Sequence, residues 1–313
     1  MIIARLQGGL GNQMFQYAAA RALAHRIGSP FKLESLTSLQ KDKQRSIALR
    51  DLHTNFDMAD RREIRKFVSL PGLYRHNPAL LSKLGRHIYR EPHFHFDPHF
   101  FSLTAPVFLD GYWQSPKYFA DIEKEIRQEF TIRPERIRNV EEQAREMRER
   151  PSVSVHIRRG DFLRPKIKSY HGVMSAFYFE KAIGIIREKL PEMYIYFFSD
   201  DMDWVKQNLV VNKNSEFISG QGRTAIEDFY LMSQCRHNII ANSSFSWWGA
   251  YLDPQAEVYA PARCDKRGTG AISASLLARP WCWWMPLRPQ RPGLQAWAAL
   301  LPARWKSATG RTV

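Results

Sequence analysis

Residues 153–161, VSVHIRRGD, place an alternating apolar and polar run directly before two adjacent arginines and a glycine. The alternation over 153–157 is typical of a β-strand. Residues 193–198, MYIYFF, lie beyond a helical segment at 176–190 and are rich in aromatic and β-branched side chains, as in a strand buried on both faces. Strands that alternate with helices in this way form parallel βαβ units, so the sequence predicts an α/β fold.

The same alternation extends over most of the chain. Further strands are expected at 2–6, 107–109, 237–241 and 257–260, and further helices at 14–27, 117–130, 133–151, 201–209, 227–235 and from 244 onward. Helix starts are expected at Asn12, at Ser115 followed by Pro116, at Asp200, and at a capping box of Thr224 and Glu227, and Gly28 is expected to end the first helix.

The length of 313 residues is sufficient for two domains, each with its own core. We expect two Rossmann-like domains at 1–149 and 150–280, followed by an extension at 281–313. The 46 Lys and Arg against 31 Asp and Glu give a net charge of +15. This charge favours anionic partners, which include nucleic acid, acidic lipid headgroups and phosphorylated small molecules.

Cysteines and apolar runs indicate the compartment. Cys235, Cys264 and Cys282 have no paired short spacing, which excludes a disulfide scaffold and a cysteine-rich zinc module and fits a reducing compartment. The N-terminus has no basic region followed by a long apolar stretch, and no run approaches the roughly 18 apolar residues of a spanning helix. The sequence therefore predicts a cytoplasmic protein.

Ligands of open parallel sheets bind at the carboxyl ends of the strands. Arg158 and Arg159 leave a predicted central strand at that edge, and an arginine fork suits bidentate binding of phosphate. A structural ion pair with Asp161 explains the pattern equally well, and both interpretations hold if one arginine is paired and the other is not. Asp200 follows the next strand, where it is suited to accept hydrogen bonds from a ligand.

Two other junctions carry small residues. Residues 242–248, NSSFSWW, end a strand and begin a helix whose N–H groups and hydroxyls suit a phosphate, with ordinary serine capping as the alternative. Residues 8–12, GGLGN, form a glycine loop that lacks the full G-x-G-x-x-G pattern and a P-loop lysine, so a tight βα turn explains it as well.

Two stretches resemble metal ligand sets, but we expect no metal site in either. Asp201 and Asp203 are a spaced acidic pair, but Asp200 and Asp203 lie where a helix cap and an acidic first turn would place them. Residues 93–99, HFHFDPH, would put three histidines and Asp97 on one face if extended, which suits zinc, but Pro98 disfavours a regular strand there.

Four motifs resemble those of the bacterial α-1,2-fucosyltransferases of glycosyltransferase family 11: QGGLGNQMFQYAAARALA at 7–24, LDGYWQSPKYF at 109–119, HIRRGD at 156–161 and EDFYLMSQCRHNIIANSSFSWWGAYL at 227–252. The resemblance extends over about residues 1–265. It implies a GT-B-like fold, with two Rossmann-like domains facing each other across a cleft. It also implies GDP-fucose as the donor, inversion at the fucose anomeric carbon, and no metal or other cofactor.

The resemblance assigns roles to individual residues. Arg158 matches the essential family arginine that binds the donor pyrophosphate, and is the expected catalytic residue. Asp161 completes this motif but, like Glu227, is expected to be mainly structural. With Asp200 added from its position, the expected donor-binding residues are Gly11, Asn12, His156, Arg159, Asp161, Asp200, Asp228, Ser243, Ser244 and Phe245.

The implied reaction moves fucose to the 2-hydroxyl of a terminal β-galactoside. The sugar becomes oxocarbenium-like as GDP leaves, and Arg158 with the N–H groups near Ser243 would stabilise the charge that develops on GDP. Residues 1–149 form the expected acceptor side and 150–280 the donor domain. The expected partners are GDP-fucose and a galactose-terminated glycan, with a lipid-linked acceptor as one form, and no nucleic acid.

Residues 281–313 hold five of the nine tryptophans, five basic residues and no acid. Such a mixture suits a membrane interface, so one hypothesis is that this extension holds the enzyme on the inner face of the membrane. Packing of the extension against the domains is the alternative.

Two other functions stay open. A GT-B transferase with a different nucleotide sugar or linkage is one. A non-catalytic basic protein that binds nucleic acid or anionic membrane is the other, and it predicts a continuous basic patch, whereas the basic residues here are scattered along the sequence.

Overall fold

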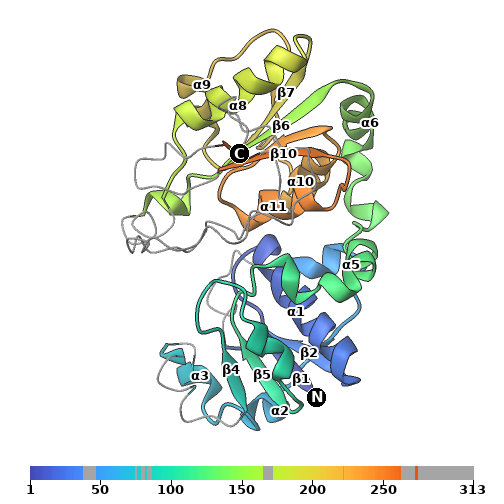
Figure 1. Cartoon of the computed structure of the whole chain (residues 1–313), viewed down its shortest axis with the longest axis vertical. Coiled ribbons are helices and arrows are strands. Elements are labelled where there is room, and N and C mark those ends of the chain that lie inside the picture. Colours follow the sequence, from blue (N-terminus) through green and yellow to red (C-terminus); the bar gives the residue numbers. More distant parts are fainter. Residues whose placement is uncertain are drawn as a thin grey trace, which may run out of the picture. The chain divides into compact units, whose positions relative to one another are not determined.

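The computed structural model describes residues 1–37, 47–74, 76–78, 82, 87–164, 172–220, 222–261 and 272–273. The chain forms two compact units (Figure 1). Unit 1 comprises Met1–Glu149, Gly222–Gln234 and Ser243–Pro254, and unit 2 comprises Arg150–Gln221, Cys235–Asn242 and Gln255–Val313. Two segments beyond residue 150 thus group with the N-terminal unit.

Among the described residues, unit 1 contains a five-stranded parallel sheet with the strand order β3-β2-β1-β5-β4 (Figure 1). The strands are β1 (Ile2–Arg5), β2 (Phe31–Glu34), β3 (Asp57–Met58), β4 (Ile88–Arg90) and β5 (Val107–Asp110). All residues of β1 and β5 are buried, as central strands require. The strand order changes direction at β1, so ligands are expected to bind at the carboxyl ends of β1 and β5. We call this end of a sheet, where the carboxyl ends of its strands lie, the ligand edge.

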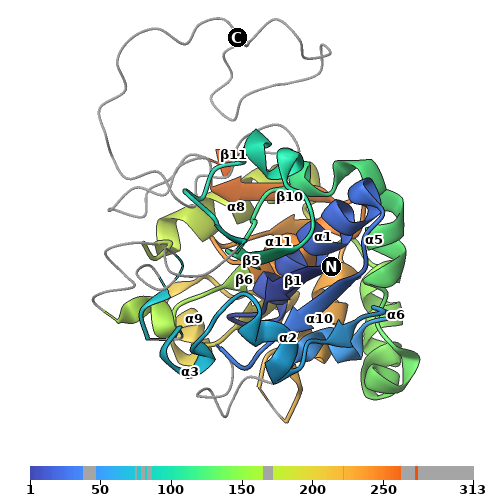
Figure 2. The ribbon, with the colours of Figure 1, turned by 90° about the horizontal axis from the view of Figure 1, so that it is seen from below.

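The α-helices of unit 1 are α1 (Leu10–Ile27), α2 (Arg61–Arg65), α3 (Pro71–Tyr74), α5 (Glu123–Glu129), α6 (Glu141–Glu149), α10 (Ala225–Ser233) and α11 (Ser244–Tyr251). The alanine-rich helix α1 lies beside both β1 and α11 (Figure 2). Its Phe15 ring packs 4.7 Å from the ring of Trp247 and 4.8 Å from that of Trp248, measured between centroids. This aromatic cluster joins α11 to the glycine-loop helix.

Unit 2 contains a six-stranded sheet with the strand order β11-β10-β9-β6-β7-β8, of which β11 alone is antiparallel to its neighbour among the described residues. The strands are β6 (Ser152–Ile157), β7 (Tyr194–Ser199), β8 (Ser215–Phe217), β9 (His237–Ile239), β10 (Glu257–Pro261) and β11 (Ile272–Ser273). Helix α8 (Ala176–Lys189) packs Phe179 and Ile183 in one core with Val155 and Ile195. Helix α9 (Met202–Asn208) follows β7. The order changes direction at β6, which ends immediately before Arg158.

Helix capping agrees with the sequence at Thr224 and Gly28 and differs at Asn12 and Asp200. The Thr224–Glu227 capping box and the left-handed C-cap Gly28, with φ 61°, are confirmed. The predicted cap Asn12 is wrong, because α1 begins at Leu10 and Asn12 lies in its first turn. The predicted cap Asp200 is also wrong, because Asp201 performs this role and accepts from the N–H of Trp204 at 3.2 Å. Both corrections leave the predicted cap side chain available for other contacts.

The single helix expected at 117–130 is interrupted. Ser115 caps a 3₁₀ turn at Pro116–Tyr118, a second turn covers Ala120–Ile122, and α5 starts only at Glu123. The break falls at Phe119, whose φ is −132° and whose buried ring stacks 5.3 Å from that of Trp248. Burial of this ring outweighs the helix propensity of the segment.

No helix in the described part of the chain combines the length and apolarity needed to cross a membrane. The extension at 281–313 lies outside the described residues.

Candidate functional site

Arg158 is held between two carboxylates at the carboxyl end of β6. Its Nη2 atom donates to Asp161 Oδ1 at 2.8 Å, and its Nη1 atom lies 2.9 Å from Asp200 Oδ2. The side chain is 32% exposed, so the guanidinium is fixed in direction yet accessible to solvent. The two ion pairs engage only two of its five N–H donors. The predicted pair with Asp161 is confirmed, and the arrangement aligns an arginine at the ligand edge of unit 2.

Arg159 is paired as well. Its Nε atom donates to Asp201 Oδ2 at 3.1 Å, and its guanidinium carbon lies 4.0 Å from the centre of the Trp204 ring. Its backbone N–H donates to Asp200 Oδ1 at 2.8 Å. The interpretation in which one arginine is paired and the other is not is therefore wrong. Arg159 connects the turn after β6 to α9. The side chain of Arg158 is more exposed than that of Arg159.

A single carboxylate organises the turn after β6. Asp200 contacts the guanidinium of Arg158 and the backbone of Arg159, and a Cβ atom at Gly160 would overlap Asp200 Oδ2. A larger residue at position 160 would displace the Asp200 carboxylate, so glycine permits this approach. Asp200 lies where the sequence predicted it, at the end of a strand and beside the arginines.

His156 is buried two residues before Arg158. Burial, with a smaller effect from the charge of Arg158, lowers the pKa of His156 to about 3. Its imidazole is therefore neutral at physiological pH and adds no positive charge to the site. Its contribution to an anion site is limited to shape and hydrogen bonding.

In unit 1 the glycine loop after β1 meets the start of α11. Asn12 Oδ1 accepts from Ser244 Oγ at 2.7 Å and from Gln114 Nε2 at 2.8 Å. A Cβ atom at Gly11 would overlap the backbone of Ser244, so this approach needs glycine. The structure thereby brings together Gly11, Asn12 and Ser244, which the sequence predicted from two distant motifs.

The other predicted residues of unit 1 lie on α10 and α11. Ser243 is the N-cap residue of α11 and is buried, but its hydroxyl makes no capping bond, so ordinary capping does not explain this serine. The ring of Phe245 packs 5.4 Å from that of Phe229, and Asp228 precedes Phe229 in the first turn of α10.

Sequence reasoning missed a buried ion pair at the ligand edge of unit 1. Arg5, the last residue of β1, lies 2.8 Å from Asp110, the last residue of β5, and their side chains are 7% and 3% exposed. The hydroxyl of Tyr74 donates to Asp110 at 2.9 Å, and Arg5 Nε donates to Thr37 Oγ1 at 2.9 Å. A buried pair whose hydrogen bonds are satisfied fixes the local structure. The only indication in the sequence is a charge at the end of each apolar strand.

Sequence reasoning also missed Glu91, which follows β4. Its carboxylate accepts from the backbone N–H of Tyr112 at 2.7 Å and from that of Trp113 at 3.1 Å. Burial raises the pKa of Glu91 to about 7. Trp113 is fully buried with φ 56°, a left-handed conformation that is unfavourable for a bulky residue. Glu91 therefore holds a strained turn at the ligand edge.

The histidine-rich segment is held by its own hydrogen bonds. Asp97 accepts from the hydroxyl of Tyr89 and from the backbone N–H of His99, and His93 Nδ1 lies 3.1 Å from the carbonyl oxygen of His95. Within the described ranges, no group of three or more His, Cys, Asp or Glu side chains is arranged to hold a metal ion.

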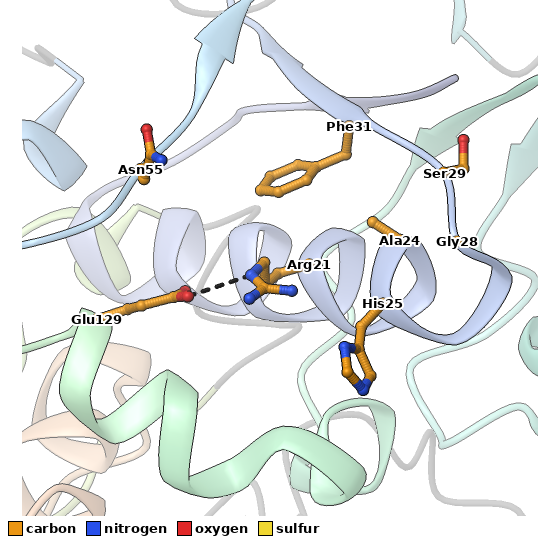
Figure 3. A pocket seen from close by; sticks show the side chains of 8 residues that line it. All are labelled: Arg21, Ala24, His25, Gly28, Ser29, Phe31, Asn55 and Glu129. Atoms are coloured by element: carbon orange, nitrogen blue, oxygen red, sulfur yellow. Dashed lines mark hydrogen bonds and ion pairs between the residues drawn. The ribbon is translucent and has the colours of Figure 1, made fainter.

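A pocket of about 360 Å³ lies at the end of the unit 1 sheet that is opposite the carboxyl ends of its strands (Figure 3). Gly28 follows the end of α1 and Phe31 begins β2, so the pocket lies at the amino ends of the strands. The ion pair between Arg21 and Glu129, at 3.1 Å, forms part of its lining. This pocket is therefore separate from the residues at the ligand edge.

The first comparison with known proteins concerns sequence. A family model described as glycosyl transferase family 11 matches residues 1–265. An alpha-1,2-colitosyltransferase of Escherichia coli is 32% identical over 277 residues, which cover 80% of this chain and 87% of the relative. A galactoside 2-alpha-L-fucosyltransferase, Sec1 of Mus musculus, is 28% identical over 284 residues, which cover 83% of this chain and 66% of the relative.

The second comparison concerns folds. The crystal structure of NodZ alpha-1,6-fucosyltransferase soaked with GDP-fucose matches with a TM-score of 0.53 at 15% identity, covering 87% of this chain and 97% of NodZ. At that identity the match establishes the fold alone. It confirms the predicted GT-B-like α/β class, with two Rossmann-like halves.

The family model covers residues 1–265 of 313, and these residues include each of the four motifs and all of the predicted site residues. The chain therefore belongs to glycosyl transferase family 11 and is a glycosyltransferase.

Proposed function

We propose that this enzyme moves fucose from GDP-fucose to the 2-hydroxyl of a terminal β-galactoside, as in O-antigen-type glycan synthesis. The observation that carries the proposal is the guanidinium of Arg158, aligned at the ligand edge of unit 2 in a family 11 chain. Two relatives add support by name, a galactoside 2-alpha-L-fucosyltransferase and an O-antigen biosynthesis glycosyltransferase, WbnK.

Arg158 is the proposed catalytic residue. When the bond between C1 of fucose and the phosphate oxygen breaks, the electron pair stays on GDP, and the charge develops on the pyrophosphate. A fixed guanidinium stabilises that charge without reorganisation in the transition state. The 2-hydroxyl oxygen of the acceptor bonds to C1 from the opposite face, which inverts the anomeric carbon, and its proton is released.

The other predicted residues are proposed to bind the donor: Gly11, Asn12, His156, Arg159, Asp161, Asp200, Asp228, Ser243, Ser244 and Phe245. Asp200 and Asp161 fit this proposal as the groups that orient Arg158. Ser243 fits it because its hydroxyl is not used as a cap at the start of α11.

A second donor sugar is favoured by one observation, the name of the E. coli relative, an alpha-1,2-colitosyltransferase. Colitose is the 3-deoxy counterpart of fucose, so the two donors differ at one hydroxyl. The same Arg158 chemistry serves both, because GDP is the leaving group in each and its pyrophosphate takes the developing charge.

Catalysis is further proposed to need no metal, since Arg158 supplies positive charge where charge develops. The test is turnover after treatment with EDTA and passage over a chelating resin. Unchanged turnover is expected, and a loss restored by added Mg²⁺ or Mn²⁺ would overturn this part.

The acceptor is proposed to be lipid-linked, and the enzyme to work in the cytoplasm against the inner face of the membrane. The support is the composition of residues 281–313, with five tryptophans, five basic residues and no acid. Deletion of these residues should abolish binding to anionic liposomes and leave the melting temperature unchanged. Unchanged liposome binding with lost folding would favour packing against the domains.

The donor assignment is tested by turnover on a β-galactoside with GDP-fucose, GDP-mannose, UDP-galactose and GDP-colitose. The fucosyl donor should give the highest kcat/KM. A higher value with the colitosyl donor would assign the second candidate, and preference for GDP-mannose or UDP-galactose would overturn both.

A further inference from the structure

We infer that Phe94 and Tyr112 form a stacking surface for the acceptor sugar, a β-galactoside, in unit 1. The inference rests on the proposed function and names the residues of its acceptor side. Both rings are partly exposed, and their centroids lie 6.3 Å apart with their planes 32° from parallel. Two partly exposed rings this close together can contact the same sugar.

The backbone that carries Tyr112 is held from two sides. Glu91 accepts from the N–H groups of Tyr112 and Trp113, and Gln16 Nε2 donates to the carbonyl oxygen of Gly111 at 3.2 Å. A Cβ atom at Gly111 would overlap Glu91, so the close approach of these two segments needs glycine. The ring of Tyr112 is thereby placed by buried groups rather than by a loose loop.

The loop that carries Phe94 is held as well. The hydroxyl of Tyr118 accepts from the N–H of Asp97 at 2.9 Å, and Asp97 accepts from the hydroxyl of Tyr89. The ring of Tyr89 stacks on that of Trp113 at 5.9 Å, which ties this loop to the turn that carries Tyr112. A surface fixed before the ligand arrives loses less entropy on binding.

The same turn also reaches the glycine loop. Gln114, two residues after Tyr112, donates to Asn12 at 2.8 Å, and Asn12 accepts from Ser244. Phe94 and Tyr112 are therefore connected, through a short run of residues, to Asn12 and Ser244 within unit 1. This continuity links the turn that carries Tyr112 to residues proposed to bind the donor.

The chemistry of the surface fits galactose. The C–H groups at C3, C4 and C5 of a β-galactoside form one apolar face, because its axial 4-hydroxyl points to the other side. Such a face packs on aromatic rings, while hydroxyls at the rim bond to polar side chains. His93 and His95 flank Phe94 in the sequence and carry polar groups that suit such hydroxyls.

The test uses Phe94→Leu and Tyr112→Leu, each of which removes a ring and keeps an apolar side chain. Tyr112→Phe is the matched control that keeps the ring. Phe96→Leu is the control for the loop, because Phe96 packs 5.0 Å from the ring of Tyr118. Melting temperatures of all variants identify any loss of folding.

Saturation-transfer NMR with methyl β-galactoside and saturating GDP reports binding without turnover. The wild type and both controls should show the strongest saturation at H3, H4 and H5 of the sugar, and each Leu variant should weaken it. In transfer assays the Leu variants should raise the acceptor KM about five- to tenfold with the donor KM unchanged. If one Leu variant fails to fold, the result of the other variant tests the inference.

Equal saturation and an acceptor KM within twofold of wild type in the folded Leu variants would overturn the inference. Failure of the proposed function looks different, because the wild type itself would then transfer no fucose to a β-galactoside. Binding of methyl β-galactoside at these rings would still be measurable in that case.

Discussion

Arg158 Nη1 lies 2.9 Å from Asp200 Oδ2, and this ion pair joins the loops that follow two neighbouring parallel strands, β6 and β7. The same carboxylate accepts from the backbone of Arg159. The guanidinium is thus aligned by a group that belongs to another strand, not only by Asp161 of its own motif. We regard this alignment as the physical basis of the proposed catalysis.

Arg158→Lys should lower kcat about 10²- to 10³-fold, the usual cost of removing one group that stabilises developing charge. Lysine keeps the charge but not the planar fork, and it cannot pair with Asp161 and Asp200 in the same geometry. The measurement is steady-state transfer from GDP-fucose, with circular dichroism to verify folding. Arg145→Lys on the exposed face of α6 is the matched control and should retain wild-type kcat. Wild-type turnover of Arg158→Lys would contradict the assigned role.

Gly160→Ala should reduce transfer about tenfold or more, because the new methyl group overlaps Asp200 and displaces the partner of Arg158. Gly184→Ala is the control, since a Cβ atom at that position of α8 meets no other atom. We expect Gly184→Ala to keep full activity and to raise the free energy of unfolding by about 0.5–1 kcal/mol. Equal activity of the two variants would show that the contact between residues 160 and 200 is unimportant.

Gly11→Ala should destabilise the protein by about 1–3 kcal/mol, as overpacking of a close backbone approach does. Its Cβ atom would overlap the backbone of Ser244 and separate α1 from α11. Gly9→Ala, two residues earlier with an ordinary φ of −82° and no atom near the new Cβ, should change the free energy of unfolding by less than about 1 kcal/mol. Urea denaturation compares the two variants, and similar losses would refute the contact between Gly11 and Ser244.

His156→Gln should make the free energy of unfolding fall less steeply as the pH is lowered below about 6.5. The pKa of His156 is lowered to about 3 in the folded state, whereas the unfolded histidine titrates near 6.5. The unfolded state therefore binds more protons between these values, and the contribution of His156 is lost as the pH falls below about 6.5, by at most about 1.4 kcal/mol per pH unit. Glu91, with its pKa raised to about 7, has the opposite effect on the pH dependence of stability. This effect is the same in both proteins, so it cancels when wild type and His156→Gln are compared.

The measurement for His156 is the free energy of unfolding of wild type and His156→Gln at pH 7.5, 6.0 and 5.0. The difference between them should shrink as the pH falls. A difference that is constant over this range would mean that the pKa of His156 in the folded protein equals that in the unfolded chain.

The main strands follow from the sequence because their residues form an alternating apolar pattern, as in β6, or a continuous apolar run, as in β7. The short strands β2, β3, β4, β8 and β11 were not predicted. Their residues form brief mixed runs, and their pairing depends on longer neighbours, so no local pattern marks them. The break at Phe119 likewise depends on Trp248, which is distant in the sequence.

The candidate site was predicted in part. The arginines and Asp200 follow from the rule that ligands bind at strand ends, and the pairing of Arg158 with Asp161 follows from their spacing. The predicted caps Asn12 and Asp200 failed because local capping patterns do not include tertiary partners such as Ser244. Glu91 was missed because its role depends on the backbone of a turn about twenty residues away.

The linkage of the product tests whether Arg158 serves transfer of fucose to the 2-hydroxyl of galactose. The enzyme is incubated with GDP-fucose and lactose, and the product is analysed by two-dimensional NMR. One new α-fucosyl residue attached to O2 of galactose is expected from the wild type, and about 10²- to 10³-fold less of it from Arg158→Lys. Attachment at any other oxygen, a β-linked product, or equal product from both proteins would contradict this expectation.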